Sequence, residues 1–190
     1  MNDTYKKYQH VERLGSDETD GIEVGTCYIF PKIDGTNAHI WHDGTDIHCG
    51  SRNRELSLDK DNAGFMAWVL TQEKLKGLAM TYRNCHIYGE WLVPHSLKTY
   101  EESAWRKFYV FDIVSAEGKH IPFVQYEQDL KDHDVDYIAP LRVIKNPTFE
   151  NIMKCLGQNT FLVKDGEGVG EGVVVKNYDY VNKFGRQIFN

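Results

Sequence analysis

The sequence predicts an α+β fold in which mainly antiparallel sheets are flanked by helices. Two observations favour this class. Strand-like runs outnumber helix-like runs, and the Asp43-Gly44 pair between two of the strand-like runs is a strong hairpin signal. The chain has 190 residues, of which 41% are apolar and 26% charged, a composition typical of globular proteins. That length suits one hydrophobic core, so we expect a single domain over residues 1–190.

The expected strands are short runs rich in β-branched and aromatic residues. They cover residues 26–30, 37–41, 47–50, 85–92, 107–114 and 171–176. The expected helices have apolar residues at helical spacing, or a proline near the first turn. They cover residues 62–75, 123–131 and 147–156.

Charge and hydropathy exclude several function classes. The 22 basic and 28 acidic residues give a net charge of -6, which excludes nucleic-acid binding by bulk positive charge but not a local basic cleft. No stretch of about 18 apolar residues exists, so we expect no membrane-spanning helix. The polar N-terminus predicts no secretory signal. Four cysteines without a C-x-x-C pair are typical of free thiols in a reducing compartment, so we expect a cytoplasmic protein.

A group of potential zinc ligands lies near the expected hairpin: His39, His42, His48 and Cys49. Their spacing matches no common zinc module, and they fall on two short strands joined by a turn. We therefore interpret them as parts of the hairpin.

Lys32 is a candidate for covalent chemistry, in the segment FPKIDGTN at residues 30–37. The ordinary interpretation is a hairpin with Asp34-Gly35 as its turn and Lys32 as a solvated strand end. The chemical interpretation is a nucleophilic lysine in a short loop between strands. A lysine amine can attack phosphorus only when it is uncharged, a form that burial and neighbouring cations favour.

Attack on the α-phosphate of a nucleoside triphosphate has further requirements. It needs carboxylates for a divalent metal, cations for the phosphates, a flat surface for the base and polar groups for the ribose. The chain offers candidates in the order Arg52, Glu90, Tyr109, Phe111, Glu171 and Lys176. Each residue alone fits an ordinary role better, such as a surface charge, a core aromatic or an exposed ion pair. Their occurrence together, in one order, favours the chemical interpretation.

In that order the chain resembles the covalent nucleotidyltransferases, which are ATP-dependent DNA and RNA ligases and GTP-dependent mRNA capping enzymes. Lys32-Ile33-Asp34-Gly35 resembles their K-x-D-G nucleophile motif, and Ser51-Arg52 resembles motif Ia. Residues 88–90 (YGE) resemble motif III, 108–113 (FYVFDI) motif IIIa and 171–176 (EGVVVK) motif IV. The resemblance covers about residues 27 to 190 and implies a ligase-type nucleotidyltransferase domain with an ATP-grasp-like fold.

Asn37 indicates which member of the superfamily the chain resembles. DNA ligases and capping enzymes usually have arginine two residues after the motif's glycine, where this chain has Asn37. In this it is similar to RNA ligases of the second phage class and to RNA-editing ligases. The resemblance therefore implies an ATP-dependent RNA ligase that joins 5′-phosphate and 3′-hydroxyl RNA ends through lysyl-AMP and an adenylylated 5′ end. An ATP-dependent DNA ligase is the alternative.

Motif V of the family carries lysines that contact the α-phosphate. By family spacing it falls about twenty residues beyond Glu171, at or just past Asn190. Either Lys176, Lys183 or Arg186 replaces it, or it lies outside the printed chain. We also expect no OB-fold or C-terminal helical domain within residues 1–190. A chain that lacks motif V would be a non-catalytic module that binds a nucleotide or an RNA end.

The resemblance implies three catalytic residues. Lys32 is the nucleophile, Glu171 binds the metal directly or through water, and Lys176 neutralises phosphate charge. Asp34 positions the lysine loop or a hydrated metal. Lys32, Asp34 and Lys176 also border the nucleotide. The implied cofactors are ATP and Mg²⁺ or Mn²⁺.

The resemblance also implies the other nucleotide contacts. Asn37 and Arg52 contact nucleotide phosphate or the RNA end, and Glu90 holds the ribose. Phe111 stacks on adenine, with Tyr109 as a second candidate because residues two apart share a face of a strand. The implied partners are ATP and nicked or paired RNA ends.

Overall fold

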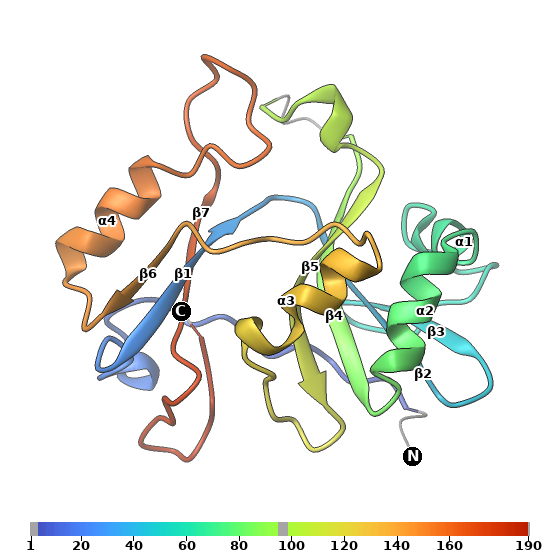
Figure 1. The fold of residues 1–190 in the computed structure, drawn as a ribbon, viewed down its shortest axis with the longest axis horizontal. Helices are drawn as coiled ribbons and strands as arrows, with labels where there is room; N and C mark the ends of the chain where they lie inside the picture. Colours follow the sequence, from blue (N-terminus) through green and yellow to red (C-terminus); the bar gives the residue numbers. More distant parts are fainter. Residues whose placement is uncertain (1–3, 95–98, 190) are drawn as a thin grey trace. The chain divides into compact units, whose positions relative to one another are not determined.

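Antiparallel strands form two sheets in the computed structural model of the chain, which describes residues 4–94 and 99–189 (Figure 1). The strands are β1 (Thr26–Lys32), β2 (Thr36–His42), β3 (Ile47–Ser51), β4 (Cys85–Leu92), β5 (Lys107–Ser115), β6 (Arg142–Lys145) and β7 (Gly172–Lys176). The helices are α1 (Phe65–Val69), α2 (Glu73–Thr81), α3 (Phe123–Asp132) and α4 (Phe149–Gly157), with 3₁₀ turns η1 (Asp17–Thr19) and η2 (Glu102–Ala104). The predicted α+β class is confirmed.

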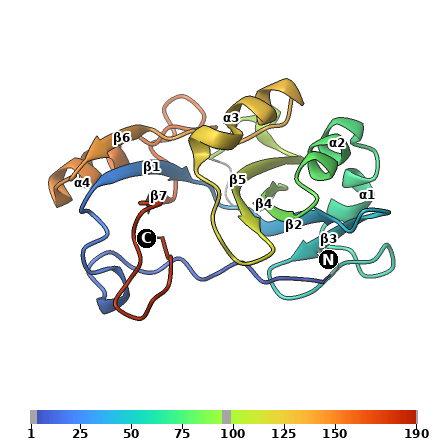
Figure 2. The ribbon, with the colours of Figure 1, turned by 60° about the horizontal axis from the view of Figure 1, so that its bottom comes forward.

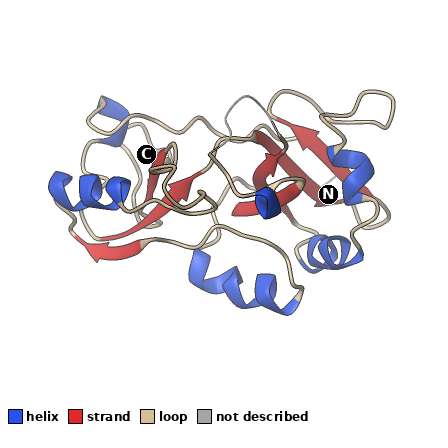
Figure 3. Ribbon diagram, turned by 90° about the horizontal axis from the view of Figure 1, so that it is seen from above, coloured by secondary structure: helices blue, strands red, loops and turns tan. Residues whose placement is uncertain are grey.

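Each sheet is the centre of one compact unit. Unit 1 comprises the described residues of Met1–Tyr8, Gly35–Val93 and Arg106–Tyr137 and holds the sheet β3-β2-β4-β5. Unit 2 comprises the described residues of Gln9–Asp34, Pro94–Trp105 and Ile138–Asn190 and holds the sheet β6-β1-β7. Helices border the strands in both units (Figure 3). One domain over residues 1–190 stays a prediction.

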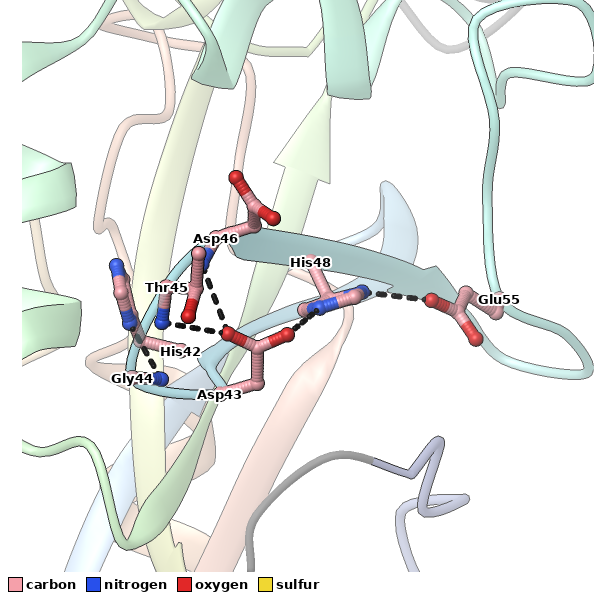
Figure 4. Close-up of polar contacts among 7 residues, drawn as sticks. All are labelled: His42, Asp43, Gly44, Thr45, Asp46, His48 and Glu55. Carbon is pink, nitrogen blue, oxygen red and sulfur yellow. Dashed lines mark hydrogen bonds and ion pairs between the residues drawn. The ribbon is translucent and has the colours of Figure 1, made fainter.

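The β2–β3 hairpin of unit 1 is confirmed, with His42 opposite Ile47 next to the turn. The Asp43 carboxylate accepts hydrogen bonds from the amides of Thr45 and Asp46, at 2.7 and 2.8 Å (Figure 4). It also contacts Nε2 of His48 at 2.7 Å. Hydrogen bonds from the Asp46 amide, His48 and the Thr45 amide hold the pKa of Asp43 well below its usual range. The turn is therefore closed by a charged carboxylate.

One face of the four-stranded sheet is covered by helices. Helix α1 packs against β3, and α2 packs against β2 and β4. The ring of Phe65 lies 5.5 Å from that of Trp91 and 5.0 Å from that of Phe108. These buried rings form the apolar core between α1 and the sheet.

The other face carries a buried stack of imidazole and aromatic rings. The ring of His39 lies 4.7 Å from Tyr88 and 5.0 Å from Trp41, and that of His86 lies 4.8 Å from Trp41. The N-terminal segment runs beside β2 and β3 (Figure 2), and its Tyr5 ring lies 5.2 Å from His39. Burial, with a smaller charge effect, lowers the pKa of His39 to about 3 and that of His86 to about 4. Both histidines are therefore uncharged near neutral pH.

The helix expected over 62–75 is wrong in extent, because α1 and α2 are separate. The Asp61 carboxylate accepts hydrogen bonds from the amides of Met66 and Ala67 and so fixes the start of α1. Gln72 has φ -101° and ψ 85°, which interrupts the helical backbone before α2. Helix α2 then continues past Gly77, whose weak helix propensity hid this part of the helix in the sequence.

In unit 2, β1 is the central strand, with β6 on one side and β7 on the other. Helix α4 packs against β1 and β7 (Figure 2). The core consists of Cys27, Ile29, Ile152, Cys155 and Val175. Helix α4 begins after the N-cap Thr148, whose side chain forms a reciprocal capping box with Asn151. The expected start at Pro147 was therefore two residues early.

No helix among the described residues is long and apolar enough to cross a membrane. All four cysteines are free thiols.

Candidate functional site

Lys32 is the last residue of β1, where it pairs with Gly172 of β7. Strand β1 runs two residues further than expected, through Pro31, so Lys32 does not lie in a loop. Strands β1 and β2 belong to different sheets, and the chain passes from unit 2 to unit 1 between Asp34 and Gly35. The interpretation of Asp34-Gly35 as an ordinary hairpin turn is therefore wrong.

The ammonium group of Lys32 contacts the Glu171 carboxylate. Glu171 directly precedes β7, so the pairing of Gly172 with Lys32 brings the two side chains to the same end of the sheet. Chance motifs would predict that Lys32 and Glu171 lie far apart, and the structure places them in contact. The side chains are 45% and 39% exposed, so a ligand can reach both.

Tyr100 holds the loop after Lys32. The amide of Asp34 donates a hydrogen bond of 2.7 Å to the Tyr100 hydroxyl, and Tyr100 is only 3% exposed. Sequence reasoning missed Tyr100, because it lies 66 residues from Asp34 and outside every expected element. The Asp34 side chain is half-buried, and its expected role in positioning the lysine loop or a metal stays a prediction.

Lys176 lies deeper in unit 2 than a solvated strand-end charge would. It is 2% exposed, and its ammonium lies 4.6 Å from the Phe30 ring centroid and 5.2 Å from that of Phe189. It is four positions along β7 from Gly172, or about 13 Å of strand. The alternative that Lys176 forms an exposed pair with Glu171 is therefore wrong. Its role in phosphate neutralisation stays a prediction.

The two other cations considered for motif V also lie in unit 2. Lys183 forms an ion pair with Asp17 at 3.0 Å. Arg186 is exposed. The expected position of motif V itself, at or past Asn190, lies outside the described residues.

Three of the expected nucleotide contacts form one row across the sheet of unit 1. Glu90 pairs with Asn37 of β2 on one side and with Tyr109 of β5 on the other. Paired residues of adjacent antiparallel strands point to the same face of a sheet, so these three side chains share a face. The Oδ1 atom of Asn37 is buried and has no hydrogen-bond partner within 4–94 and 99–189. Tyr109 is only 4% exposed, which limits its value as a stacking surface.

Glu90 also holds the start of unit 1 after Asp34. Its Oε1 accepts a hydrogen bond of 3.1 Å from the amide of Gly35. A Cβ atom at Gly35 would lie 2.6 Å from the carbonyl oxygen of Trp91, so only glycine fits. Glu90 is two residues before the end of β4.

Phe111 lies at a β-bulge. Tyr88 pairs with Asp112 and Gly89 with Val110, which leaves Phe111 as the extra residue between the two pairs. The expectation that Tyr109 and Phe111 share a face assumed strict alternation, which this bulge interrupts.

Tyr8 of the N-terminal segment contacts Phe111, with ring centroids 5.1 Å apart and an edge-on geometry. The Tyr8 hydroxyl donates to the Asp112 carboxylate at 2.8 Å, and that carboxylate also contacts Nδ1 of His120 at 2.6 Å. Sequence reasoning missed Tyr8, because the first 25 residues show no strand or helix pattern.

Arg52 follows β3 and is exposed. Its backbone carbonyl accepts a hydrogen bond of 2.6 Å from the Tyr5 hydroxyl, but within the described chain its guanidinium has no hydrogen bond or ion pair. Arg54 differs, because its guanidinium donates to the carbonyls of Lys60 and Asp61 and so stabilises a loop. Of these two arginines, Arg52 is the one available to bind a phosphate.

Glu171 is a carboxylate that could hold a divalent cation, because its side chain is partly exposed and contacts Lys32. No cluster of three or more His, Cys, Asp or Glu suited to a metal ion occurs among the residues that the structure describes. Mg²⁺ bound with a nucleotide needs only one or two protein carboxylates, because water and phosphate oxygens supply its other ligands. The exposed Glu171 fits that requirement. The histidines and the cysteine considered as zinc ligands lie on β2 and β3, the two strands of the hairpin.

Comparison with known proteins identifies a family and a fold. The sequence model of the RNA ligase family matches residues 25–189. Comparison with curated protein sequences finds no significant match.

Similar solved structures include several of Naegleria gruberi RNA ligase. The structure with PPi has a TM-score of 0.73 and 22% identity, with 92% of this chain and 53% of that chain covered. A mutant with ATP and Mn has a TM-score of 0.71 and 20% identity, with 98% of this chain and 56% of that chain covered. Another mutant, with AMP and Mn, has a TM-score of 0.72 and 20% identity, with 92% of this chain and 53% of that chain covered. At this identity the likeness shows the fold, and the chain spans about half the length of the chains it matches.

Proposed function

The chain belongs to the RNA ligase family, and we propose that it is an ATP-dependent RNA ligase. The proposed reaction joins a 5′-phosphate to a 3′-hydroxyl through lysyl-AMP and an adenylylated 5′ end. The observation that carries the proposal is the contact of Lys32 with Glu171, which joins the matched nucleophile motif to the matched metal-binding motif. The Naegleria structures with ATP, AMP, PPi and Mn support ATP and a divalent cation as cofactors.

In the proposed first step, Nζ of Lys32 attacks the α-phosphate of ATP. A nitrogen–phosphorus bond forms, the bond to the pyrophosphate oxygen breaks, and the amine loses its protons to solvent. An ammonium group paired with a carboxylate has no free lone pair with which to attack phosphorus. The carboxylate must therefore release the amine before the reaction. A Mg²⁺ or Mn²⁺ ion bound to Glu171 would supply a competing positive charge and neutralise phosphate charge.

The later proposed steps leave Lys32 free again. The AMP phosphorus passes from the lysine nitrogen to an oxygen of the RNA 5′-phosphate. The RNA 3′-hydroxyl then attacks that 5′-phosphate, and AMP departs as the leaving group. The covalent intermediate divides one difficult displacement into easier ones.

Residues of unit 1 are proposed to bind the nucleotide and the RNA end. Glu90 accepts hydrogen bonds from ribose hydroxyls, and Phe111 stacks on adenine. Asn37 offers its buried Oδ1, which has no partner within the described chain and can accept a hydrogen bond from bound ligand. Arg52 binds phosphate, because its exposed guanidinium forms no hydrogen bond or ion pair with the described residues.

The first experiment tests nucleotide transfer. The protein is mixed with ATP labelled at the α-phosphate and with Mg²⁺ or Mn²⁺, and label on the protein is measured. We expect label on the wild type and none on Lys32→Ala. Lys154→Ala is the matched control, because Lys154 is an exposed lysine of the same unit in an ion pair with Glu150. Label that persists on Lys32→Ala would refute the nucleophile, and an unlabelled wild type would favour the non-catalytic module.

The second experiment tests RNA against DNA. Nicked duplexes of matched sequence, one with an RNA nick and one with a DNA nick, are ligated at several salt concentrations. We expect the RNA nick to be sealed faster, with a rate that falls as salt rises. Preference for the DNA nick would favour the DNA ligase alternative. A role in RNA repair in the cytoplasm is part of the proposal, and the four free thiols suit a reducing compartment.

A further inference from the structure

Asn159 holds both neighbours of Glu171. It is fully buried, and its side-chain Nδ2 donates a hydrogen bond of 2.7 Å to the carbonyl oxygen of Gly172. Its backbone carbonyl accepts a hydrogen bond of 2.7 Å from the amide of Gly170. The residue that contacts Lys32 is therefore flanked on each side by a residue bonded to Asn159.

This support matters because Glu171 lies outside the strand ladder. Strand β7 begins at Gly172, and Gly170 and Gly172 both lack the side chains that restrict backbone rotation. A carboxylate between two glycines has many backbone conformations unless other groups fix them. The two hydrogen bonds with Asn159, one donated and one accepted, fix the backbone on either side of Glu171.

The segment that follows Asn159 also supports the loop after Lys32. Val163 forms an antiparallel bridge with Tyr100, and the carbonyl of Leu162 accepts a hydrogen bond of 2.9 Å from the Glu101 amide. Tyr100 in turn accepts the hydrogen bond from the Asp34 amide. One short stretch of unit 2 thus supports both partners of the Lys32–Glu171 contact.

We propose that Asn159 is a positioning residue that aims the Glu171 carboxylate at the metal ion and Lys32 during AMP transfer. This inference rests on the proposed function, because it assigns a task within that reaction. Asn159 does not touch the nucleotide in this account. It acts through the backbone of residues 170–172, as groups behind a metal ligand do in other metal sites.

Gly170 offers an independent way to disturb the same support. A Cβ atom at Gly170 would lie 2.7 Å from Nδ2 of Asn159, and the three nearest atoms all belong to the Asn159 side chain. Gly170→Ala must therefore displace the Asn159 amide. When Asn159 is already alanine, the added methyl group meets none of those atoms.

The experiment measures the single-turnover rate of AMP transfer to the protein as a function of Mn²⁺ concentration. The variants are Asn159→Ala, Gly170→Ala and the double variant. Asn151→Ala is the matched control, because Asn151 caps α4 in the same unit through hydrogen bonds with Thr148. Thermal unfolding of every variant is recorded at the same pH.

We expect Asn159→Ala to raise the Mn²⁺ concentration for half-maximal transfer by roughly 10- to 100-fold. Gly170→Ala should show a similar defect, and the double variant should be no worse than Asn159→Ala alone. Asn151→Ala should lower the unfolding temperature and leave the Mn²⁺ dependence unchanged. If Asn159→Ala does not fold, Gly170→Ala against Asn151→Ala decides the question.

Two outcomes would overturn the inference. One is an Asn159→Ala or Gly170→Ala protein with the wild-type Mn²⁺ dependence. The other is a change in Mn²⁺ dependence in Asn151→Ala as large as in the other variants, which would show a general effect of destabilisation. In both cases the wild type still gains AMP, so the proposed function stands. A wild type that gains no AMP contradicts the proposed function itself.

Discussion

The side chains of Lys32 and Glu171 are in contact although the two residues lie 139 positions apart in the sequence. The contact follows from the pairing of β1 with β7, in which Lys32 lies opposite Gly172. Both side chains are partly exposed, so the pair contributes little to folding. A role of the Lys32–Glu171 pair in the proposed reaction therefore explains its position better than a contribution to the stability of the fold.

The substitution Glu171→Gln should distinguish a role of Glu171 in AMP transfer from a contribution to the stability of the fold. The substitution removes the charge that holds Lys32, and the free energy of unfolding should change by about 1 kcal/mol or less, as is usual for exposed ion pairs. The rate of AMP transfer should fall on the order of 100-fold, because a neutral amide binds a divalent cation poorly. Chemical denaturation and single-turnover transfer measure the two effects.

Glu150→Gln is the control for Glu171→Gln. Glu150 forms an exposed ion pair with Lys154 at 3.0 Å on α4, so its loss should change neither measurement appreciably. Transfer at the wild-type rate by Glu171→Gln would show that this carboxylate has no part in the reaction.

The variants Glu90→Gln and Glu90→Ala should differ in their free energy of unfolding. Glu90→Gln keeps an oxygen acceptor for the Gly35 amide, whereas Glu90→Ala leaves that partly buried donor without its partner, at a cost of about 1–3 kcal/mol. Both variants should bind ATP about 10-fold more weakly, because a charge-assisted hydrogen bond to ribose is lost. Calorimetric titration and chemical denaturation provide the values. Wild-type affinity in Glu90→Gln would limit Glu90 to a structural role.

His48 should make the stability of the chain depend on pH. Burial opposes its charged form, but the hydrogen bonds to Asp43 and Glu55 outweigh burial and raise the pKa of His48 above its usual value of 6.5 (Figure 4). The stabilisation is therefore complete below pH 6.5 and is lost as pH rises through the higher folded-state pKa. The unfolding temperature of the wild type should exceed that of His48→Gln by about 2 °C near pH 5.5 and by less near pH 9.

The control for this prediction is His10→Gln, since His10 is exposed and has no bonded partner in the described part of the chain. Near pH 5.5 the unfolding temperature should fall less in His10→Gln than in His48→Gln, because the substitution of His10 removes no hydrogen bond or ion pair of the described chain. A His48→Gln difference that stays constant from pH 5.5 to 9 would contradict the assignment of a charged imidazole.

Local pattern was sufficient to predict much of the fold. Strand β4 matches the expected residues 85–92, and α3 ends one residue later than expected. These elements have alternating or helical apolar spacing that reflects one buried face. Strand β6 was missed, because four largely exposed residues carry no such pattern. Its position depends on pairing with β1, which sequence spacing does not encode.

The residues of the candidate site also differ in whether the sequence could identify them. Lys32 and Glu171 lie in short motifs, so order along the chain was enough to select them. Tyr100 and Asn159 act through hydrogen bonds to backbone atoms far away in the sequence, and no residue type or spacing marks such contacts. Such hydrogen bonds between distant residues can be identified only from the three-dimensional structure.

The most direct test of the account is to locate AMP on the protein. The chain is incubated with ATP and Mn²⁺, the intact mass is measured, and the modified peptide is sequenced by mass spectrometry at a pH that preserves the nitrogen–phosphorus bond. The account predicts a gain of one AMP, carried by Lys32. An AMP found on another lysine, such as Lys176 or Lys183, or a protein that gains no AMP, would contradict it.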